Sequence, residues 1–314
     1  MSYDVLTMGR VGVDIYPLQT GVGLEDVETF GKFLGGSATN VAVAAARHGR
    51  TSAVITRTGA DPFGRYVHRA LREFGVDDAF VTAVPELPTP VTFCEIFPPD
   101  DFPIWFYRYP KAPDLEIKPE EIPAAEIRDA RLFWTTVTGL CAEPSRSAHH
   151  EAFQARNRAP LTVLDLDYRP VFWASREQAR EQVQAALPHV TVAVGNLDEV
   201  DTAVGARDAR AAAEALLEAG VELAVVKRGP EGVYARTRDT EAEVPPIRVK
   251  VVNGLGAGDG FGGALCHGLL AGWPLERIIR FANAAGAIVT TRLECSSAMP
   301  TTEEVESFLR MSHA

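Results

Sequence analysis

The chain has 314 residues, of which 46% are hydrophobic and 23% charged, and these proportions are ordinary for a globular protein. Its formal net charge of −11 argues against a nucleic-acid partner, because a protein that binds nucleic acid needs a basic face. The first residues lack the basic start and long apolar run of a signal peptide, so none is expected, and no run of about 18 apolar residues predicts a membrane span. The four cysteines show no zinc-ligand or CxxC spacing, which favours free thiols in a reducing cytoplasm.

Short apolar runs alternate with helical patterns along most of the chain. In chain order the pattern predicts a strand at 5–8, a helix at 40–47, a strand at 53–57, a helix at 63–74, strands at 132–137, 161–165 and 190–194, a helix at 211–219 and a strand at 223–227. Such alternation is typical of a mostly parallel sheet with helices on both faces. We therefore expect an α/β fold, a Rossmann-like domain of three layers.

Two segments do not follow this alternation, residues 14–34 and residues 89–109. In the second segment two strand patterns flank a turn at 98–101, which indicates a hairpin. The two segments together could form a small β sheet, a lid built from about 13–35 and 88–112, although edge strands of the main sheet are the alternative. No repeat or low-complexity linker divides the chain, so we expect one domain over residues 1–314.

The stretch 253–263 gathers glycines around one aspartate, Asp259, immediately before a pattern of apolar residues typical of a helix. Backbone N–H groups at a helix N-terminus lack intrahelical partners and bind phosphate or a developing oxyanion. The backbone of Gly256, Ala257 and Gly258 would form this anion site, and the carboxylate of Asp259 could take a proton from a nucleophile. The arrangement favours phosphoryl transfer, with a plain turn and helix cap as the alternative.

Two rival functions compete with this one. Residues 258–263 formally match the GxGxxG pattern of dehydrogenases, but too little chain follows for a dinucleotide-binding fold. A sugar or nucleotide sensor without catalysis would be expected to lose either its base or its anion site, and both are present here.

A second glycine pair, Gly35 and Gly36, precedes Asn40 at the start of the first long helix. This pair, taken together with the 256–259 motif, resembles the two signatures of the ribokinase-like (pfkB-type) carbohydrate kinase family, and the resemblance covers nearly the whole chain. It implies a three-layer domain with a β lid, and transfer of a phosphoryl group from ATP to a sugar with the help of Mg²⁺.

The resemblance also assigns expected roles to single residues. The acceptor sugar would be held by Asp14, Gly35, Gly36 and Asn40. Asn196 and Glu199 match an Asn-x-x-Glu motif associated with magnesium and phosphate, which they would hold through water; a helix cap is the alternative for them. The nucleotide would lie against Asn196, Lys227, Gly229, Gly232, Gly258 and Asn283. Relatives also form dimers through the lid, so a homodimer is a further expectation.

The acceptor that the resemblance favours is a sugar acid. The stretches 13–17, 106–108, 165–173 and 253–259 look like those of the subgroup that phosphorylates the primary hydroxyl of 5-dehydro-2-deoxygluconate in inositol catabolism. A sugar acid carries a carboxylate, and guanidinium is the group that pairs bidentately with carboxylate. Arg108 and Arg169, together with Asp167, are therefore expected at the acceptor. Kinases of 2-dehydro-3-deoxygluconate have similar arginines and stay an alternative, as do kinases of fructose, ribose or nucleosides.

One residue departs from the family pattern. Many members carry an aspartate, part of a monovalent-cation site, where this chain has Asn253. The requirement for K⁺ is therefore left open.

Overall fold

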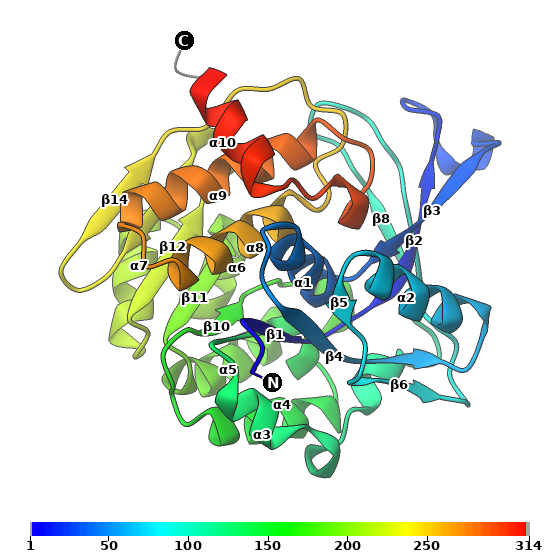
Figure 1. Cartoon of the computed structure of the whole chain (residues 1–314), viewed down its shortest axis with the longest axis horizontal. Coiled ribbons are helices and arrows are strands. Elements are labelled where there is room, and N and C mark those ends of the chain that lie inside the picture. The colour runs from blue at the N-terminus through cyan, green and yellow to red at the C-terminus, as the bar shows by residue number, and fades with distance from the viewer. Residues whose placement is uncertain (1, 312–314) are drawn as a thin grey trace.

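The computed structural model describes residues 2–311 and arranges them as a central sheet covered by helices on both faces, with a smaller sheet at one side (Figure 1). The central strands are parallel except for β13 and β14, and their order is β14-β13-β12-β11-β10-β9-β1-β4-β5, with β6 beside β4. Their bounds are β1 Val5–Met8, β4 Ser52–Gly59, β5 Val76–Asp77, β6 Val81–Val84, β9 Leu132–Thr136, β10 Thr162–Asp165, β11 Val192–Asn196, β12 Leu223–Lys227, β13 Val233–Arg236 and β14 Glu241–Val244.

The helices divide into two layers, each with its own apolar contacts to the sheet. One layer holds α1 Ser37–Arg47, α2 Pro62–Glu73, α8 Ala257–Leu270, α9 Leu275–Thr290 and α10 Thr302–Met311. The other layer holds α3 Ala124–Asp129, α4 Ser145–Arg156, α5 Arg176–Ala186, α6 Leu197–Val204 and α7 Ala209–Glu218. The central strands are therefore buried on both faces, as their continuous apolar runs require. The predicted α/β, three-layer fold class is confirmed.

The smaller sheet is the predicted lid, and its order is β3-β2-β7-β8. Its strands are β2 Gly12–Pro17, β3 Phe30–Gly35, β7 Val91–Cys94 and β8 Ile104–Tyr107. Because side chains alternate between the two faces of a strand, paired residues share a face. Asp14 is paired with Thr92, and Thr92 with Phe106, so these three residues form one row on the inner face of the lid.

The first long helix begins earlier than the sequence pattern suggested. α1 starts at Ser37, directly after Gly36, whose φ of 102° is a conformation that favours glycine. A Cβ on Gly36 would lie 2.4 Å from the carbonyl oxygen of Arg10, so no other residue fits there without a shift of the backbone. Asn40 therefore lies inside the first turn of α1 rather than capping the helix, and its side chain is free for other partners.

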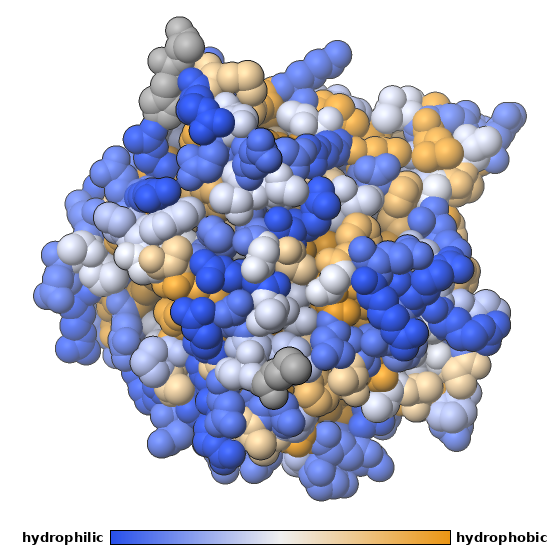
Figure 2. Space-filling model, in the orientation of Figure 1, coloured by the Kyte–Doolittle hydropathy of each residue, from blue (hydrophilic) through white to orange (hydrophobic). Residues whose placement is uncertain are grey.

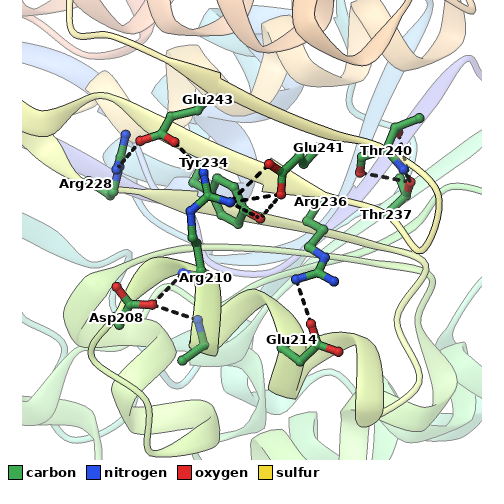
Figure 3. A network of polar contacts seen from close by, with 11 residues as sticks. Asp208, Arg210, Glu214, Arg228, Tyr234, Arg236, Thr237, Thr240, Glu241 and Glu243 are labelled. Atoms are coloured by element: carbon green, nitrogen blue, oxygen red, sulfur yellow. Dashed lines mark hydrogen bonds and ion pairs between the residues drawn. The ribbon is translucent and has the colours of Figure 1, made fainter.

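A network of ion pairs attaches the β13–β14 hairpin to α7 and to the loop after β12 (Figure 3). Arg210 of α7 pairs with Glu241 and Glu243 of β14. Glu243 also accepts a hydrogen bond of 2.9 Å from Arg228, the residue that follows β12. Single exposed ion pairs contribute little to stability, but a shared network restricts the geometry of the segments that it joins. This network fixes the hairpin beside residues 227–232.

Within residues 2–311, no helix is long and apolar enough to cross a membrane.

Candidate active site

Asp259 lies in the first turn of α8, and the helix begins directly after a glycine in the left-handed region. Gly256 precedes the helix with a φ of 80°, and a Cβ there would lie 2.8 Å from Cys295 Sγ. The first N–H groups of an α-helix have no partner within the helix and give this end a partial positive charge. The backbone N–H groups of Ala257 and Gly258, in this first turn, therefore have no acceptor within the helix.

Asp259 is held by a side chain from α1. Asn40 Nδ2 donates a hydrogen bond of 2.7 Å to Asp259 Oδ2, and Ser296 Oγ donates one of 2.6 Å to Asn40 Oδ1. Burial raises the pKa of Asp259 to about 6, against the opposing effect of the Asn40 hydrogen bond. A carboxylate with this pKa is ionised at neutral pH and still basic enough to accept a proton from a hydroxyl group.

The α8 N-terminus separates two hollows. One is a small cavity of about 50 Å³ between the lid and the main domain, and Gly256 and Asp259 line it. The other is a larger groove of about 820 Å³, and Ala257 and Gly258 line it. A phosphoryl group that passes from the groove to the cavity would therefore pass the unpaired N–H groups of α8. We call the small cavity the acceptor cavity and the larger groove the donor groove.

The acceptor cavity collects most of the residues predicted for the sugar. Asp14, Gly36, Asn40 and Arg169 line it. Gly35 does not, but a Cβ there would lie 2.3 Å from Asp14 Cγ, so the glycine leaves room for that carboxylate. Burial raises the pKa of Asp14 to about 6.

Asp167 lies behind the cavity rather than at its surface. It is buried and accepts a hydrogen bond of 2.7 Å from Ser37 Oγ and one of 3.3 Å from Arg10 Nη2. Arg169 Nε lies 3.0 Å from Asp167 Oδ1. Burial alone would raise the pKa of Asp167, but Arg10 and Arg169 hold it well below its usual range. Asp167 is therefore an anionic anchor for two arginines.

The structure does not bring Arg108 to the acceptor cavity. Its Nη2 lies 2.7 Å from Asp114 Oδ2; the Asp114 side chain is buried and that of Arg108 is mostly so. Its guanidinium also lies over the ring of Phe172, 5.1 Å from the centroid. These contacts engage Arg108 within the protein, beside the cavity.

The donor groove collects most of the residues predicted for the nucleotide. Lys227, Gly229, Gly232, Gly258 and Asn283 all line it. A Cβ on Gly258 would lie 3.3 Å from Lys227 Nζ, so the ammonium group lies close to the start of α8. Burial lowers the pKa of this lysine, but carboxylates, Glu199 and Asp165 foremost, raise it above its ordinary value. Lys227 therefore carries a positive charge at the groove.

Asn196 and Glu199 lie next to the donor groove without lining it. Asn196 is the register partner of Lys227 on the neighbouring strand. Asn196 Oδ1 accepts from the backbone N–H of Glu199 at 2.9 Å, and Glu199 Oε2 accepts from that of Asn196 at 2.7 Å. The two residues thus form the helix cap that was the alternative for them.

The same residues suit magnesium held through water. Among residues 2–311 there is no group of three or more His, Cys, Asp or Glu side chains that could hold a metal ion. Mg²⁺ keeps several of its waters and takes one or two carboxylates plus the phosphates of its substrate, so it needs no such group. The buried side chains of Glu199 and Asp165 lie near Lys227. Burial raises the pKa of Asp165, and a bound cation would favour its ionised, metal-binding form. This oxygen-rich donor set is of the type that Mg²⁺ prefers.

The glycines of the GxGxxG match are inside α8, not in a turn between a strand and a helix. A Cβ on Gly263 would lie 2.2 Å from Ala44 Cβ, and one on Gly260 would lie 2.7 Å from Val289 Cγ2. These glycines allow α8 to pack closely on α1 and α9. The strand–turn–helix arrangement that a dinucleotide site requires is not found at 258–263.

The residues of this region that sequence reasoning missed include Arg10, Tyr16 and Ser296. Arg10 and Tyr16 line the acceptor cavity, and Ser296 contacts Asn40. Arg10 could have been found, because it follows the end of the first predicted strand, where α/β proteins place their ligands. Ser296 gave no signal, since only the folded chain brings residue 296 to residue 40.

Comparison with known proteins identifies relatives of the whole chain. The model for pfkB family carbohydrate kinases matches residues 3–302. Two curated relatives are named 5-dehydro-2-deoxygluconokinase. The one from Photobacterium profundum is 34% identical over 314 residues, covering 98% of this chain and 94% of the relative. The one from Listeria monocytogenes serotype 4b (strain CLIP80459) is 31% identical over 314 residues, covering 98% of this chain and 96% of the relative.

A solved structure has the same architecture. The crystal structure of a fructokinase with bound ATP from Xylella fastidiosa matches with a TM-score of 0.87 at 25% sequence identity, covering 99% of this chain and 100% of that chain.

Proposed function

This chain belongs to the pfkB family of carbohydrate kinases, and within that family we propose that it transfers the γ-phosphoryl group of ATP to the primary hydroxyl of 5-dehydro-2-deoxy-D-gluconate. The two glycine motifs predicted membership of this family, and that prediction is confirmed. The protein is therefore a sugar phosphotransferase. The proposal adds the acceptor and the roles of single residues to that assignment.

One observation carries the proposed mechanism: Asp259 faces the acceptor cavity from the same helix turn whose backbone faces the donor groove. Asp259 accepts the proton of the acceptor hydroxyl as the oxygen attacks the γ-phosphorus. The N–H groups of Gly256, Ala257 and Gly258 stabilise the charge on the transferring oxygens. Because the transition state of phosphoryl transfer is loose, most of the rate comes from positioning and electrostatics.

The donor side has a matching set of roles. Lys227 and the loop at Gly229 and Gly232 hold the phosphates, and Asn283 lies along the nucleotide. Asn196 and Glu199, with Asp165, would hold Mg²⁺ through its waters. When it is bound, Mg²⁺ neutralises the phosphate oxygens and so favours departure of ADP.

Support for a sugar acid comes from two sources. The curated relatives described above, similar over nearly their whole length, are named for 5-dehydro-2-deoxygluconate. The acceptor cavity is lined by guanidinium groups, which pair with carboxylate. Neutral sugars have no group that requires such partners.

The proposal is tested by ADP release with Mg-ATP and a panel of acceptors. The panel contains 5-dehydro-2-deoxygluconate, 2-dehydro-3-deoxygluconate, fructose, ribose and adenosine. We expect the highest kcat/KM for the first compound. Preference for the second would keep the sugar-acid class and change the substrate, whereas preference for a neutral acceptor would reject the sugar-acid proposal. Binding of the sugars without any turnover would favour a sensor.

We also propose that the lid pairs two copies of the chain. The face of the lid opposite to the acceptor cavity exposes Phe30, Trp105 and Tyr107, and the side of the molecule that carries the lid shows hydrophobic residues at its surface (Figure 2). Contiguous exposed apolar residues mark interaction surfaces. Light scattering should give the mass of a dimer for the wild type and of a monomer for Trp105→Glu; a monomeric wild type would contradict this proposal.

A further inference from the structure

Arg10 is fixed at the carboxyl end of β1 by the start of α1. Thr39 Oγ1 donates a hydrogen bond of 3.2 Å to the carbonyl oxygen of Arg10. The close approach of Gly36 to the same oxygen leaves no space for a side chain between them. The backbone from which the Arg10 side chain extends is therefore held in one place, at the edge of the sheet where α/β proteins bind ligands.

The guanidinium group of Arg10 lies between Asp167 and the lid. It donates the 3.3 Å hydrogen bond to Asp167 Oδ2, and its central carbon lies 5.6 Å from the centroid of the Phe106 ring. The side chain is 11% exposed. Asp167 contacts Arg169 through its other oxygen, so one buried carboxylate orients two guanidinium groups that both line the acceptor cavity.

Both guanidinium groups keep unused hydrogen-bond donors. Arg10 Nε is buried without a hydrogen-bond partner, and Arg169 Nε makes no hydrogen bond although it lies near Asp167. Buried polar groups are usually hydrogen-bonded, and a guanidinium group presents five N–H donors. An anion in the acceptor cavity would supply the missing acceptors, and a carboxylate offers two oxygens in the spacing that guanidinium groups recognise.

Arg108, in contrast, has its partner already. Asp114, 3% exposed, balances its charge, and the ring of Phe172 covers its guanidinium. Arg108 does not belong to the lining of the acceptor cavity.

We propose that Arg10, acting beside Arg169, binds the carboxylate of the acceptor and so selects sugar acids over neutral sugars, while Arg108 supports the protein structure next to the site. This inference rests on the proposed function, because it assigns the carboxylate of that acceptor to a residue. Asp167 acts as a positioning residue for both arginines, and Ser37 donates a hydrogen bond that holds Asp167 in turn.

The test compares kcat/KM for 5-dehydro-2-deoxygluconate with kcat/KM for fructose in the wild type and in Arg10→Met, Arg10→Lys and Arg108→Met. Methionine keeps most of the length of arginine and removes its charge and its donors. Loss of a buried charged hydrogen-bond partner should lower the ratio of the two values about 100-fold in Arg10→Met. Arg10→Lys keeps the positive charge but loses the planar guanidinium group with its paired N–H donors. Its ratio should therefore lie between those of Arg10→Met and the wild type.

Arg108→Met is the matched control for loss of an arginine next to the site. Its ratio should stay close to that of the wild type even where its melting temperature falls. Where fructose is not turned over, the dissociation constant for the sugar acid, measured by calorimetry with a non-hydrolysable ATP analogue, takes the place of the ratio. If Arg10→Met does not fold, as judged by its melting curve, Arg10→Lys and Arg108→Met decide the question.

The outcomes separate this inference from the proposed function. A wild type that phosphorylates only neutral sugars overturns the proposed function, and the role of Arg10 with it. A wild type that prefers the sugar acid, with an unchanged ratio or dissociation constant in the Arg10 variants, overturns the role of Arg10 alone. A ratio that falls in Arg108→Met as far as in Arg10→Met would also overturn the division between the two arginines.

Discussion

Asn40 Nδ2 lies 2.7 Å from Asp259 Oδ2, and this hydrogen bond joins the two glycine motifs of the chain across 219 positions of sequence. Asn40 comes from the first turn of α1, and Asp259 from the first turn of α8. The amide donates to only one carboxylate oxygen, which leaves Asp259 Oδ1 available for a hydroxyl group in the acceptor cavity. Both motifs therefore contribute to the environment of the same carboxylate.

The first prediction concerns pH. Asp259 can accept a proton only when it is ionised, and burial raises its pKa to about 6. Because the pKa of Asp259 is raised, its ionised form, which accepts the proton, is lost at a higher pH than for an ordinary aspartate. We expect kcat/KM, which reports the free enzyme, to be constant near pH 8 and to decline about tenfold per pH unit below about pH 6.

Asp14 needs to be separated from Asp259 in this experiment, because burial raises its pKa to about 6 as well. In Asp14→Asn the decline of kcat/KM at acidic pH, here called the acidic limb, should persist, although kcat/KM is lower at every pH. Disappearance of the limb in that variant would assign it to Asp14 instead.

The second prediction concerns the base itself. Asp259→Asn keeps the size of the side chain and removes the proton acceptor, so kcat should fall by about 10²- to 10⁴-fold. Mg-ATP should still raise the melting temperature of this variant, because the donor groove is lined by other residues. Loss of both folding and nucleotide binding would argue that Asp259 is structural.

The third prediction concerns Ser296, which donates to Asn40 Oδ1 and so turns the amide nitrogen toward Asp259. In Ser296→Ala the amide loses this restraint and donates less often to Asp259. The pKa of Asp259 should then rise, and the acidic limb of kcat/KM should move to higher pH, while kcat falls.

Ser145→Ala is the matched control for that variant. Ser145 is also buried, and its hydroxyl donates a hydrogen bond of 2.8 Å to the carbonyl oxygen of Gly139. Each substitution should cost about 1 kcal/mol of stability, measured by denaturant titration. Only Ser296→Ala should move the pH profile; an equal shift in both variants would mean that the effect is general destabilisation.

The fourth prediction concerns Arg108 and Asp114. Arg108→Met leaves the buried carboxylate of Asp114 without its partner, so the free energy of unfolding should fall by about 3–5 kcal/mol. The double variant Arg108→Met with Asp114→Leu removes both charges and should recover much of that loss. Urea titration of the wild type, both single variants and the double variant measures this coupling. A double variant no more stable than Arg108→Met would show that the ion pair does not account for the loss.

The fold class and the main motifs could be predicted without the structure, because both depend on local pattern. Alternating apolar runs and helical periods predict a parallel sheet wherever they occur, and the six predicted strands lie within a few residues of β1, β4, β9, β10, β11 and β12. The short strands β5, β6, β13 and β14 were not predicted. The turn at 256–259 must open a helix because a glycine and an apolar helical face stand next to each other. Strand β2 was harder to place, since its glycine-flanked segment shows no clear alternation.

Which polar residues meet, in contrast, depends on the folded arrangement. Arg108 and Arg10 are both arginines near strand ends, and local pattern does not distinguish them. Their roles differ because Asp114 lies 2.7 Å from Arg108, whereas Arg10 shares Asp167 with Arg169 and keeps a buried Nε without a hydrogen-bond partner. In the same way, Ser296 reaches Asn40 only after the lid, α1 and the segment before α10 have packed together. Partners far apart in sequence are chosen by packing, and packing is a property of the folded chain.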